Sequence, residues 1–416
     1  MPSNVMNALI LVILIGALLI LGILFAAVWR RAAAAGRYRR LDRYRDRFRE
    51  EIKGRIDARA SLQDFAGLVF RHGSTKWQAV EDVLIDLAED GRYEAVAYKL
   101  YDLLGYRLYY EGRLGGNAIA RSGAADRLGR MHCSGSTGKL VRLLAGKEPE
   151  VVAVAVRSLS RIGTPEALEA VLERLPELLS RSLVTKKSIE TSLRNFGAGA
   201  VPELIRHGRA YSDPVSRASV LEVLERLAPR DAVPFALENL ESADPEVRAK
   251  ALKVAGAGDG ILTGAEKDRI LLLLDDPVWF VRLQAAKALG RLRHRNAEPL
   301  LAKRLRDGKW LVRNAAAASL IQSCGNPADI FLDVLKGEDR YARDSVCEEV
   351  ERTGFLFRLI EDMGRPEGEI RRKSGEILKL MDSLGYGSPI RKYLEEGPDE
   401  RIRKELSLLL AEEGKT

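Results

Sequence analysis

Cysteine and histidine are scarce in this chain of 416 residues, and their scarcity excludes several classes of protein. The 3 cysteines, Cys133, Cys324 and Cys347, lie far apart without Cys-x-x-Cys spacing, which excludes a disulfide scaffold and a thiolate zinc site. A reducing compartment fits this usage best. Hydrophobic residues make up 46% of the chain, which is too many for a disordered protein.

The 4 histidines do not form a metal-binding pattern. None stands beside a glutamate or close to another histidine, so ligands for zinc or a di-iron centre are not expected. His132 precedes Cys133, but a nucleophile and its base meet in space rather than as chain neighbours. The glycine-containing stretch from Cys133 to Lys139 lacks the spacing of a phosphate-binding loop. We therefore expect no catalytic residue, no cofactor and no metal, and interpret the protein as a non-enzyme.

Charged residues are absent before Arg30, and this absence points to a membrane segment. The 22 residues from Ala8 to Trp29 are almost entirely apolar. At about 1.5 Å per residue they reach about 33 Å as a helix, enough to cross a hydrocarbon core of about 30 Å. A cleaved signal peptide is the alternative, but it would carry a charged start and a shorter apolar core. The sequence predicts a transmembrane helix over residues 8–29 after an extracytoplasmic tail of residues 1–7.

A dense basic segment follows directly. Between residues 30 and 55, eleven Lys and Arg residues stand against four Asp and Glu residues, a net charge of +7. Basic residues flank membrane helices on the cytoplasmic side, so this bias predicts an outside N-terminus and a cytoplasmic remainder. The expected location is the plasma membrane, or the inner membrane if the protein is bacterial.

Charge is nearly balanced in the rest of the chain. Outside residues 30–55, 56 basic residues face 55 acidic ones, a net charge of +1. A nucleic-acid-binding surface would spread Lys and Arg over the whole fold. We therefore expect no nucleic acid among the partners.

Residues 30–60 are expected to form a basic juxtamembrane helix. Tyr38, Leu41, Tyr44 and Phe48 recur among the arginines at spacings of three and four. Such a helix suits an anionic lipid leaflet, on which its apolar face would lie. A solvated extension of the membrane helix is an equally good interpretation.

A motif recurs along the remaining chain at intervals of about 31 residues. One copy contains Asp276, Pro277, Trp279, Val281, Arg282, Ala285, Ala286, Leu289 and Gly290, and the next contains Asp307, Gly308, Trp310, Val312, Arg313, Ala316, Ala317 and Leu320. Further copies are anchored at Arg121, Arg217, Arg248 and Arg343, and weaker ones at Val152, Lys186, Arg371 and Arg403. The chain therefore contains about ten units from residue 111 to the C-terminus.

Each unit carries the signals of two helices. Asp-Pro pairs such as Asp244-Pro245 are typical helix starts, and Gly163, Gly256 and Gly290 stand where first helices are expected to end. No stretch alternates with period two, so no strand is expected. Residues 61–110 precede the first unit and are expected to form a helical N-terminal cap. Six of the 12 tyrosines fall between residues 93 and 110 and suit either the cap interior or an aromatic docking surface.

The stretch from Asp276 to Gly290 resembles the HEAT-like repeat of the phycobilisome-lyase type. The resemblance implies stacked antiparallel helix pairs in a right-handed solenoid, with Asp and Arg of successive units paired along the stack. The residues in question are Asp244, Arg248, Asp276, Arg282, Asp307 and Arg313. Deoxyhypusine hydroxylase has a similar architecture, but its iron-binding His-Glu pairs are missing here. The predicted fold is all-α, an α-solenoid of about ten HEAT-like helix pairs over residues 111–416, preceded by one transmembrane helix.

Trp279 and Trp310 occupy the same position in adjacent units. In stacked units they are expected to be neighbours about 10 Å apart, the spacing of packed helices. They suit either packing between units or a partner-binding hot spot, because tryptophan is enriched in such sites.

These features favour a membrane-anchored cytoplasmic scaffold that binds a membrane-associated protein partner. Membrane lipid is expected to contact Ala8 to Trp29, with the arginine-rich segment as a second candidate contact. Two alternatives remain open. One is an accessory subunit of a membrane enzyme complex for glycan synthesis or transport, and the other is a HEAT-like enzyme with an unrecognised site.

Overall fold

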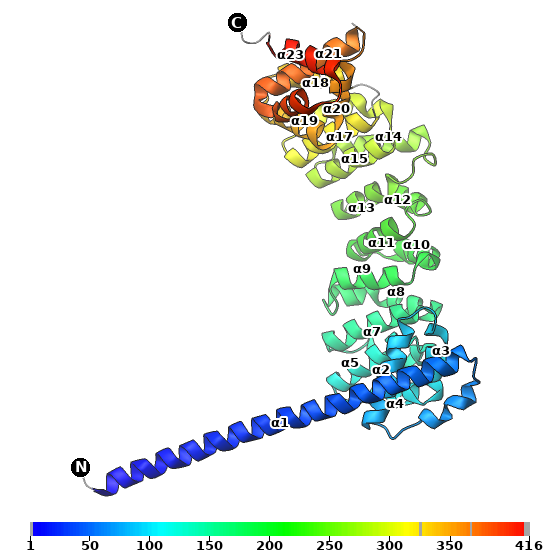
Figure 1. The fold of residues 1–416 in the computed structure, drawn as a ribbon. Coiled ribbons are helices and arrows are strands. Elements are labelled where there is room, and N and C mark those ends of the chain that lie inside the picture. The colour runs from blue at the N-terminus through cyan, green and yellow to red at the C-terminus, as the bar shows by residue number, and fades with distance from the viewer. Residues whose placement is uncertain (1–2, 324–326, 367, 412–416) are drawn as a thin grey trace. The chain divides into compact units, whose positions relative to one another are not determined.

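The structure, a computed structural model, describes residues 3–323, 327–366 and 368–411. Over these residues it consists of α-helices α1 to α23, joined by turns and short 3₁₀ or π segments, without a β-strand (Figure 1). The all-α prediction is confirmed. The chain divides into two compact units, unit 1 with residues 1–171 and unit 2 with residues 172–416. Cys324 lies outside the described residues.

Unit 1 contains the N-terminal helix, three cap helices and the first repeats. The helices are α1 (Ser3–Asp57), α2 (Thr75–Ala88), α3 (Glu94–Leu103), α4 (Tyr106–Arg113), α5 (Ala118–Arg130), α6 (Thr137–Leu143), α7 (Pro149–Ile162) and the start of α8 (Pro165–Ser180). The boundary expected between residues 110 and 111 falls inside α4, and the first repeat helix begins at Ala118.

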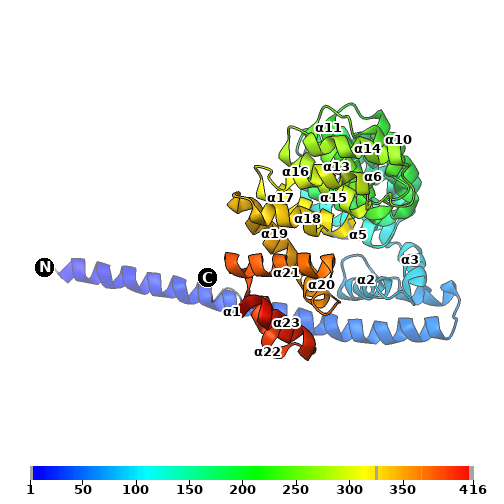
Figure 2. The same ribbon diagram turned by 90° about the horizontal axis from the view of Figure 1, so that it is seen from above.

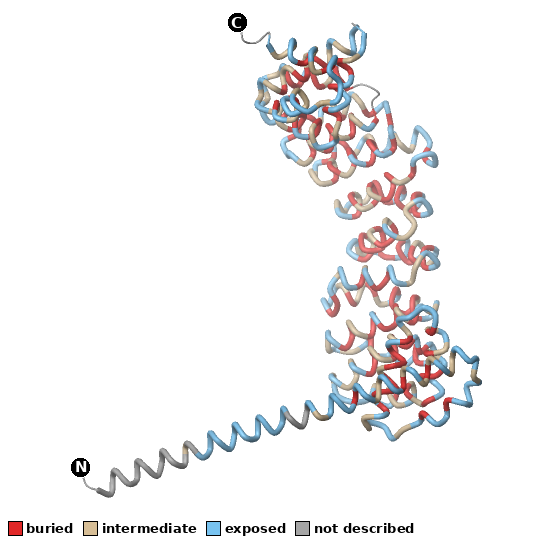
Figure 3. Tube along the Cα trace, in the orientation of Figure 1, coloured by how far each residue is buried: buried red, intermediate tan, exposed pale blue. Residues whose placement is uncertain are grey.

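Helix α1 is one continuous helix of 55 residues. The segments expected over residues 8–29 and 30–60 therefore form a single element, and the helix already starts at Ser3, within the expected tail. The residues from Leu18 to Trp29 are exposed, and this part of α1 is pale blue in Figure 3. Among the described residues, α1 is the one helix long and apolar enough to cross a membrane, a property that signal sequences share.

The second half of α1 packs against α2 (Figure 2). Leu41, Phe48 and Ile52 are buried, and the flanking Arg45 donates from Nε to Asp82 of α2 at 2.9 Å. Leu41 and Phe48 of the predicted stripe thus pack against protein rather than lie on a lipid leaflet or in solvent, whereas Tyr38 is 65% exposed. Spacing reveals an apolar stripe, but it does not reveal whether lipid or protein covers it.

The tyrosines between residues 93 and 110 fill the cap interior. Tyr101 and Tyr106 are fully buried. The hydroxyls of Tyr101 and Tyr110 donate to the two carboxylate oxygens of buried Glu81 at 3.1 and 2.9 Å. Trp77 lies against Tyr106 with ring centroids 4.8 Å apart. These contacts support the packing interpretation of the tyrosines over the docking surface.

Unit 2 continues the repeats. Its helices after α8 are α9 (Lys186–Asn195), α10 (Val201–Ala210), α11 (Pro214–Leu227), α12 (Val233–Glu238), α13 (Pro245–Ala255), α14 (Gly264–Leu272), α15 (Trp279–Arg291), α16 (Glu298–Arg304), α17 (Trp310–Ser323), α18 (Ala328–Lys336), α19 (Arg340–Arg352), α20 (Phe355–Asp362), α21 (Glu369–Met381), α22 (Ser388–Glu396) and α23 (Glu400–Ala411). The odd-numbered helices carry the repeat anchors, and α11, α13, α15, α17 and α19 pack side by side in chain order (Figure 1). Their apolar faces form the buried core of the stack.

The glycines at the ends of first helices have two different roles. Gly163 ends α7 with φ at +71°, in the left-handed region that favours glycine. Gly256 directly follows α13, which ends at Ala255 as expected, but its φ is −63°, whereas Gly290 lies inside α15. A Cβ on Gly290 would stand 2.6 Å from Ser319 Oγ of α17. Close approach of the neighbouring helix, rather than a turn, requires this glycine.

Gly129 in α5 repeats this arrangement. A Cβ there would stand 2.5 Å from the Cα of Ser158 in α7, whereas Gly123 of the same helix has open space. We expect Gly129→Ala to lower the free energy of unfolding by about 1–3 kcal/mol through overpacking, although alanine favours a helix. Urea denaturation of the full chain in detergent measures this change.

Gly123→Ala is the matched control in the same helix. It is expected to raise the free energy of unfolding by about 0.5–1 kcal/mol, the helix propensity gained when nothing obstructs the methyl group. Stabilisation by both substitutions would contradict the close helix approach.

Candidate partner-binding groove of unit 2

Arginines on the first helix of one repeat bind carboxylates of the next repeat. Arg248 of α13 donates from Nε and Nη2 to the two oxygens of Asp276 at 2.8 and 3.0 Å. Arg282 of α15 binds Asp307 in the same way, at 2.8 and 2.9 Å. The third nitrogen of each guanidinium donates to a backbone carbonyl of its own unit, that of Ser242 at 2.8 Å and that of Asp276 at 2.9 Å. Each arginine thus joins two successive repeats by a bidentate ion pair.

Asp244 and Arg313, at the two ends of the expected series of Asp–Arg pairs, do not form such pairs. The Asp244 carboxylate caps α13 and accepts the backbone N–H three residues later at 3.0 Å. Arg313 donates from Nε to Ser345 Oγ at 3.1 Å. Asp339, the corresponding acid of the next unit, instead caps α19 by accepting the Ala342 N–H at 3.1 Å. The Asp–Arg pairing implied by the resemblance therefore stops at Asp307.

Glutamates make further pairs between repeats that the sequence analysis missed. Arg121 lies 2.8 Å from Glu148, and Arg371 lies 2.5 Å from Glu405. The available signal was an acidic residue of either type 27 or 34 positions after the anchoring arginine. A pattern restricted to aspartate does not detect these pairs.

Asp307 is a buried carboxylate at the centre of this network. Burial alone would raise its pKa, but hydrogen bonds from Arg282 and the Lys309 N–H outweigh burial and hold the pKa below its ordinary value. The N–H of Lys309 lies 3.0 Å from the carboxylate, and Arg304 Nη1 lies 3.5 Å away. Asp307 is therefore ionised at neutral pH and depends on its cations.

Trp279 and Trp310 are the first residues of α15 and α17 but lie in different surroundings. Trp279 is half-buried, with its ring 5.8 Å from that of Phe280. Trp310 is 58% exposed and lines a groove that Trp279 does not line. The two tryptophans thus do not form one exposed pair, and Trp310 alone offers a free aromatic surface at this groove.

The groove has a volume of about 590 Å³ and runs over the first helices α11, α13, α15, α17 and α19, so we call it the α11–α19 groove. Its apolar part consists of Trp310, Leu283, Leu311, Ala315 and Ala318. Its polar part consists of Glu225, Lys253, Gln284, Lys287, Arg291, Asn314, Ser319, Gln322, Glu349 and Arg352. The repeat pattern did not reveal the groove, because the pattern marks the buried positions of each helix and the groove uses the opposite positions.

The thiols of Cys133 and Cys347 are unsuited to nucleophilic catalysis. Burial raises the pKa of Cys133 to about 12 and that of Cys347 to about 12. Both thiols are therefore protonated at neutral pH, whereas the thiolate is the nucleophile. The His132 ring stacks on Tyr98 at 4.7 Å between centroids, which accounts for its position beside Cys133 without chemistry.

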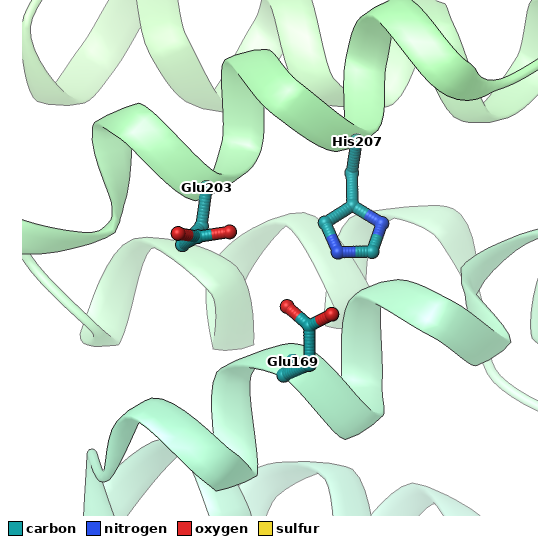
Figure 4. Close-up of side chains that lie close together, drawn as sticks. All are labelled: Glu169, Glu203 and His207. Atoms are coloured by element: carbon teal, nitrogen blue, oxygen red, sulfur yellow. The ribbon is translucent and has the colours of Figure 1, made fainter.

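Glu203 and His207 lie one turn apart on α10 of unit 2 (Figure 4). Glu169, drawn in the same view, belongs to α8 within unit 1. Arg206 lies 2.5 Å from the Glu203 carboxylate and 3.1 Å from His207 Nε2. A cation bound by the two α10 side chains would have to displace this guanidinium, so α10 does not offer a ready metal site.

Comparison with known proteins places HEAT repeats within unit 2. A family model described as HEAT repeats matches residues 266–351, which contain α15 to α18 and most of α19. A search of curated proteins found no significant match. This part of the chain therefore consists of HEAT repeats.

Several solved structures are similar to the chain. An engineered protein has a TM-score of 0.34 at 18% identity, over 85% of this chain and 99% of its own. Human deoxyhypusine hydroxylase in complex with glycerol has a TM-score of 0.26 at 22% identity, over 66% of this chain and 94% of its own. Kap121p bound to Nup53p has a TM-score of 0.38 at 14% identity, over 84% of this chain and 50% of its own.

Arg282→Ala is expected to lower the free energy of unfolding by about 3–5 kcal/mol at neutral pH, because Asp307 stays buried without its main cation. The loss should shrink in acid. The folded pKa of Asp307 lies below the ordinary value of 3.8, so its stabilising effect is complete above that value and is lost as the pH falls through the folded pKa. Urea unfolding of the full chain, stepped from neutral pH to below 3.8, measures both effects.

Arg306→Ala is the control for this pair. Arg306 binds Asp333 at 2.9 Å, but both side chains are exposed, so its loss should cost no more than about 1 kcal/mol. If Arg282→Ala and Arg306→Ala lower the free energy of unfolding equally, a buried ion pair between repeats is contradicted. A loss at Arg282→Ala that does not change with pH would contradict it as well.

Proposed function

We propose that the chain is a membrane-anchored scaffold that binds a protein partner in the α11–α19 groove. The observation that carries the proposal is Trp310, a 58% exposed tryptophan beside an apolar floor. Exposed tryptophans that line a groove are typical anchors of protein interfaces. HEAT repeats suit this role, because stacked helix pairs present an extended surface for partners.

The proposed role is binding rather than catalysis. The thiols of Cys133 and Cys347 are protonated, and Arg206 pairs with Glu203 beside His207. In the groove, Arg352 pairs with Glu349 by hydrogen bonds from Nε to both carboxylate oxygens. These arrangements support a surface that holds a partner.

We further propose that α1 spans the plasma membrane, or the inner membrane if the protein is bacterial, with its N-terminus outside. Its exposed side chains up to Trp29 suit a lipid environment. The exposed Arg30, Arg31, Arg37 and Arg39 follow within about three turns and suit anionic headgroups on the cytoplasmic side. The partner is then a membrane-associated protein, whose encounter with the scaffold a shared membrane favours.

A reporter fused after Thr416 tests this topology. We expect a green fluorescent reporter to fluoresce and an alkaline phosphatase reporter to remain inactive, because the basic segment holds the C-terminal side in the cytoplasm. Deletion of residues 3–29 should move the fusion from the membrane to the soluble fraction. Phosphatase activity would overturn the orientation, and a mature chain that begins after Trp29 would identify a signal peptide.

Trp310→Ala tests the groove. Cells that express the full chain are treated with a cross-linker, and the partners are recovered from detergent and identified by mass spectrometry. We expect Trp310→Ala to reduce recovery of the main partner by about 10-fold or more, because loss of a hot-spot tryptophan typically costs at least 2 kcal/mol of binding free energy.

Phe357→Ala is the matched control. Phe357 is an aromatic residue of similar exposure, 56%, on α20 outside the groove. The Phe357→Ala variant should recover as much of the partner as the unsubstituted chain does. Equal recovery by both variants would argue against the groove, and a lower melting temperature of Trp310→Ala alone would assign Trp310 to packing.

A further inference from the structure

We propose that the α11–α19 groove binds an acidic segment of the partner, with an apolar side chain of the segment on Trp310 and its carboxylates on Lys287 and Arg291. The inference rests on the proposed function, since it names the chemistry of the partner at the same groove. Three features of the groove support it, namely the placement of Arg291, the charge balance and the position of the apolar surface.

Arg291 is held at the groove by a contact with α13. Its Nη2 donates to the Lys253 carbonyl at 3.3 Å, and the guanidinium lies against the backbone of Gly256. A Cβ on Gly256 would stand 2.6 Å from Nη2, so glycine makes room for the charged group. Burial lowers the pKa of Arg291, and the negative charge of Glu225 opposes this effect.

The charged side chains that line the groove carry a net positive charge. Four basic and two acidic side chains line it. Arg352 donates from Nε to both oxygens of Glu349 at 2.9 Å, and Lys253 lies 3.3 Å from Glu222 just outside the lining. The second lining acid, Glu225, lies 3.0 Å from Arg226.

Lys287 and Arg291 carry the excess. Lys287 is exposed and has no ion-pair partner in the part of the chain that the structure describes, and Arg291 donates to a carbonyl only. They stand one turn apart on α15, a spacing that places both side chains on one face. This pair therefore presents two positive charges to a ligand.

The apolar surface lies beside these charges. Trp310, Leu311 and Ala315 belong to α17, which packs directly on α15. A ligand with one apolar side chain and neighbouring carboxylates matches both helices at once, which is the charge complementarity of specific interfaces. A nucleic acid would require a wider basic surface, whereas the chain outside residues 30–55 carries a net charge of +1. An acidic protein segment is therefore the occupant that the groove favours.

Selection from a phage-displayed library of random peptides tests the inference. The library is selected on the purified full chain in detergent and, in parallel, on Trp310→Ala, and peptides that require Trp310 are sequenced. We expect Asp and Glu to be enriched around one aromatic or aliphatic residue. Affinity of the best peptide, measured by fluorescence anisotropy, should fall with added salt.

Substitutions then assign the charges. The double variant Lys287→Gln/Arg291→Gln should weaken the best peptide by about 10-fold or more, the effect of lost hydrogen bonds to charged groups. Arg306→Gln, on the exposed pair outside the groove, should leave the affinity unchanged. Unchanged melting temperatures of the variants show that folding is not the cause.

The outcomes separate this inference from the proposed function. Peptides that require Trp310 but are basic, or show no charge preference, would overturn the acidic partner and leave the groove as a docking site. Normal affinity in the double variant would overturn the role of Lys287 and Arg291. If no peptide requires Trp310 and partner recovery from cells does not require it either, the inference and the proposed function both fail.

Discussion

The close approach of neighbouring first helices is the constraint on which the repeats depend. Gly129 lies against Ser158 between α5 and α7, and Gly290 lies against Ser319 between α15 and α17. At each contact only small residues permit the helix separation that the structure shows. A unit of about 31 residues cannot bury its apolar faces alone, so this separation also decides how much core two units share. Stability of the stack thus depends on residues that contribute almost no apolar area themselves.

The arginine–aspartate pairs between repeats also depend on the short distance between neighbouring first helices. Arg248 and Arg282 reach the next unit because successive first helices lie side by side, and each guanidinium fixes one unit on the next. The carboxylates they bind are buried, so each pair specifies the alignment of two units more than it adds net stability. The groove lies on the same set of helices, and Trp310 owes its position to that alignment.

The repeat architecture was predictable from sequence because it depends on the spacing of residues within each helix. Anchors such as Arg217 and Arg371 mark first helices that the structure contains, α11 and α21. Apolar residues three and seven positions later identify the buried face of each helix. These signals require no knowledge of which surfaces meet.

The features that sequence analysis missed all depend on contacts between distant residues. The apolar stripe of Leu41 and Phe48 is covered by α2, which spacing alone does not show. Gly256, which follows the last residue of α13, also makes room for Arg291, 35 positions further along the chain. Trp279 and Trp310 share one position in the repeat, yet only Trp310 lines a groove. Position in a repeat determines the helix face of a side chain but not what the next unit leaves uncovered.

The continuity of α1 has a mechanical consequence. From Trp29 to Leu41, the first buried residue of its packed half, α1 advances twelve residues, or about 18 Å, with no break in the helix. A flexible linker would let the cap tumble freely, whereas an unbroken helix behaves as a stiff lever. In the proposed orientation, any tilt of the span is transmitted through this lever to α2, and the stand-off between bilayer and cap is set by helix length. The anchor would thus act as a spacer with a defined direction as well as a tether.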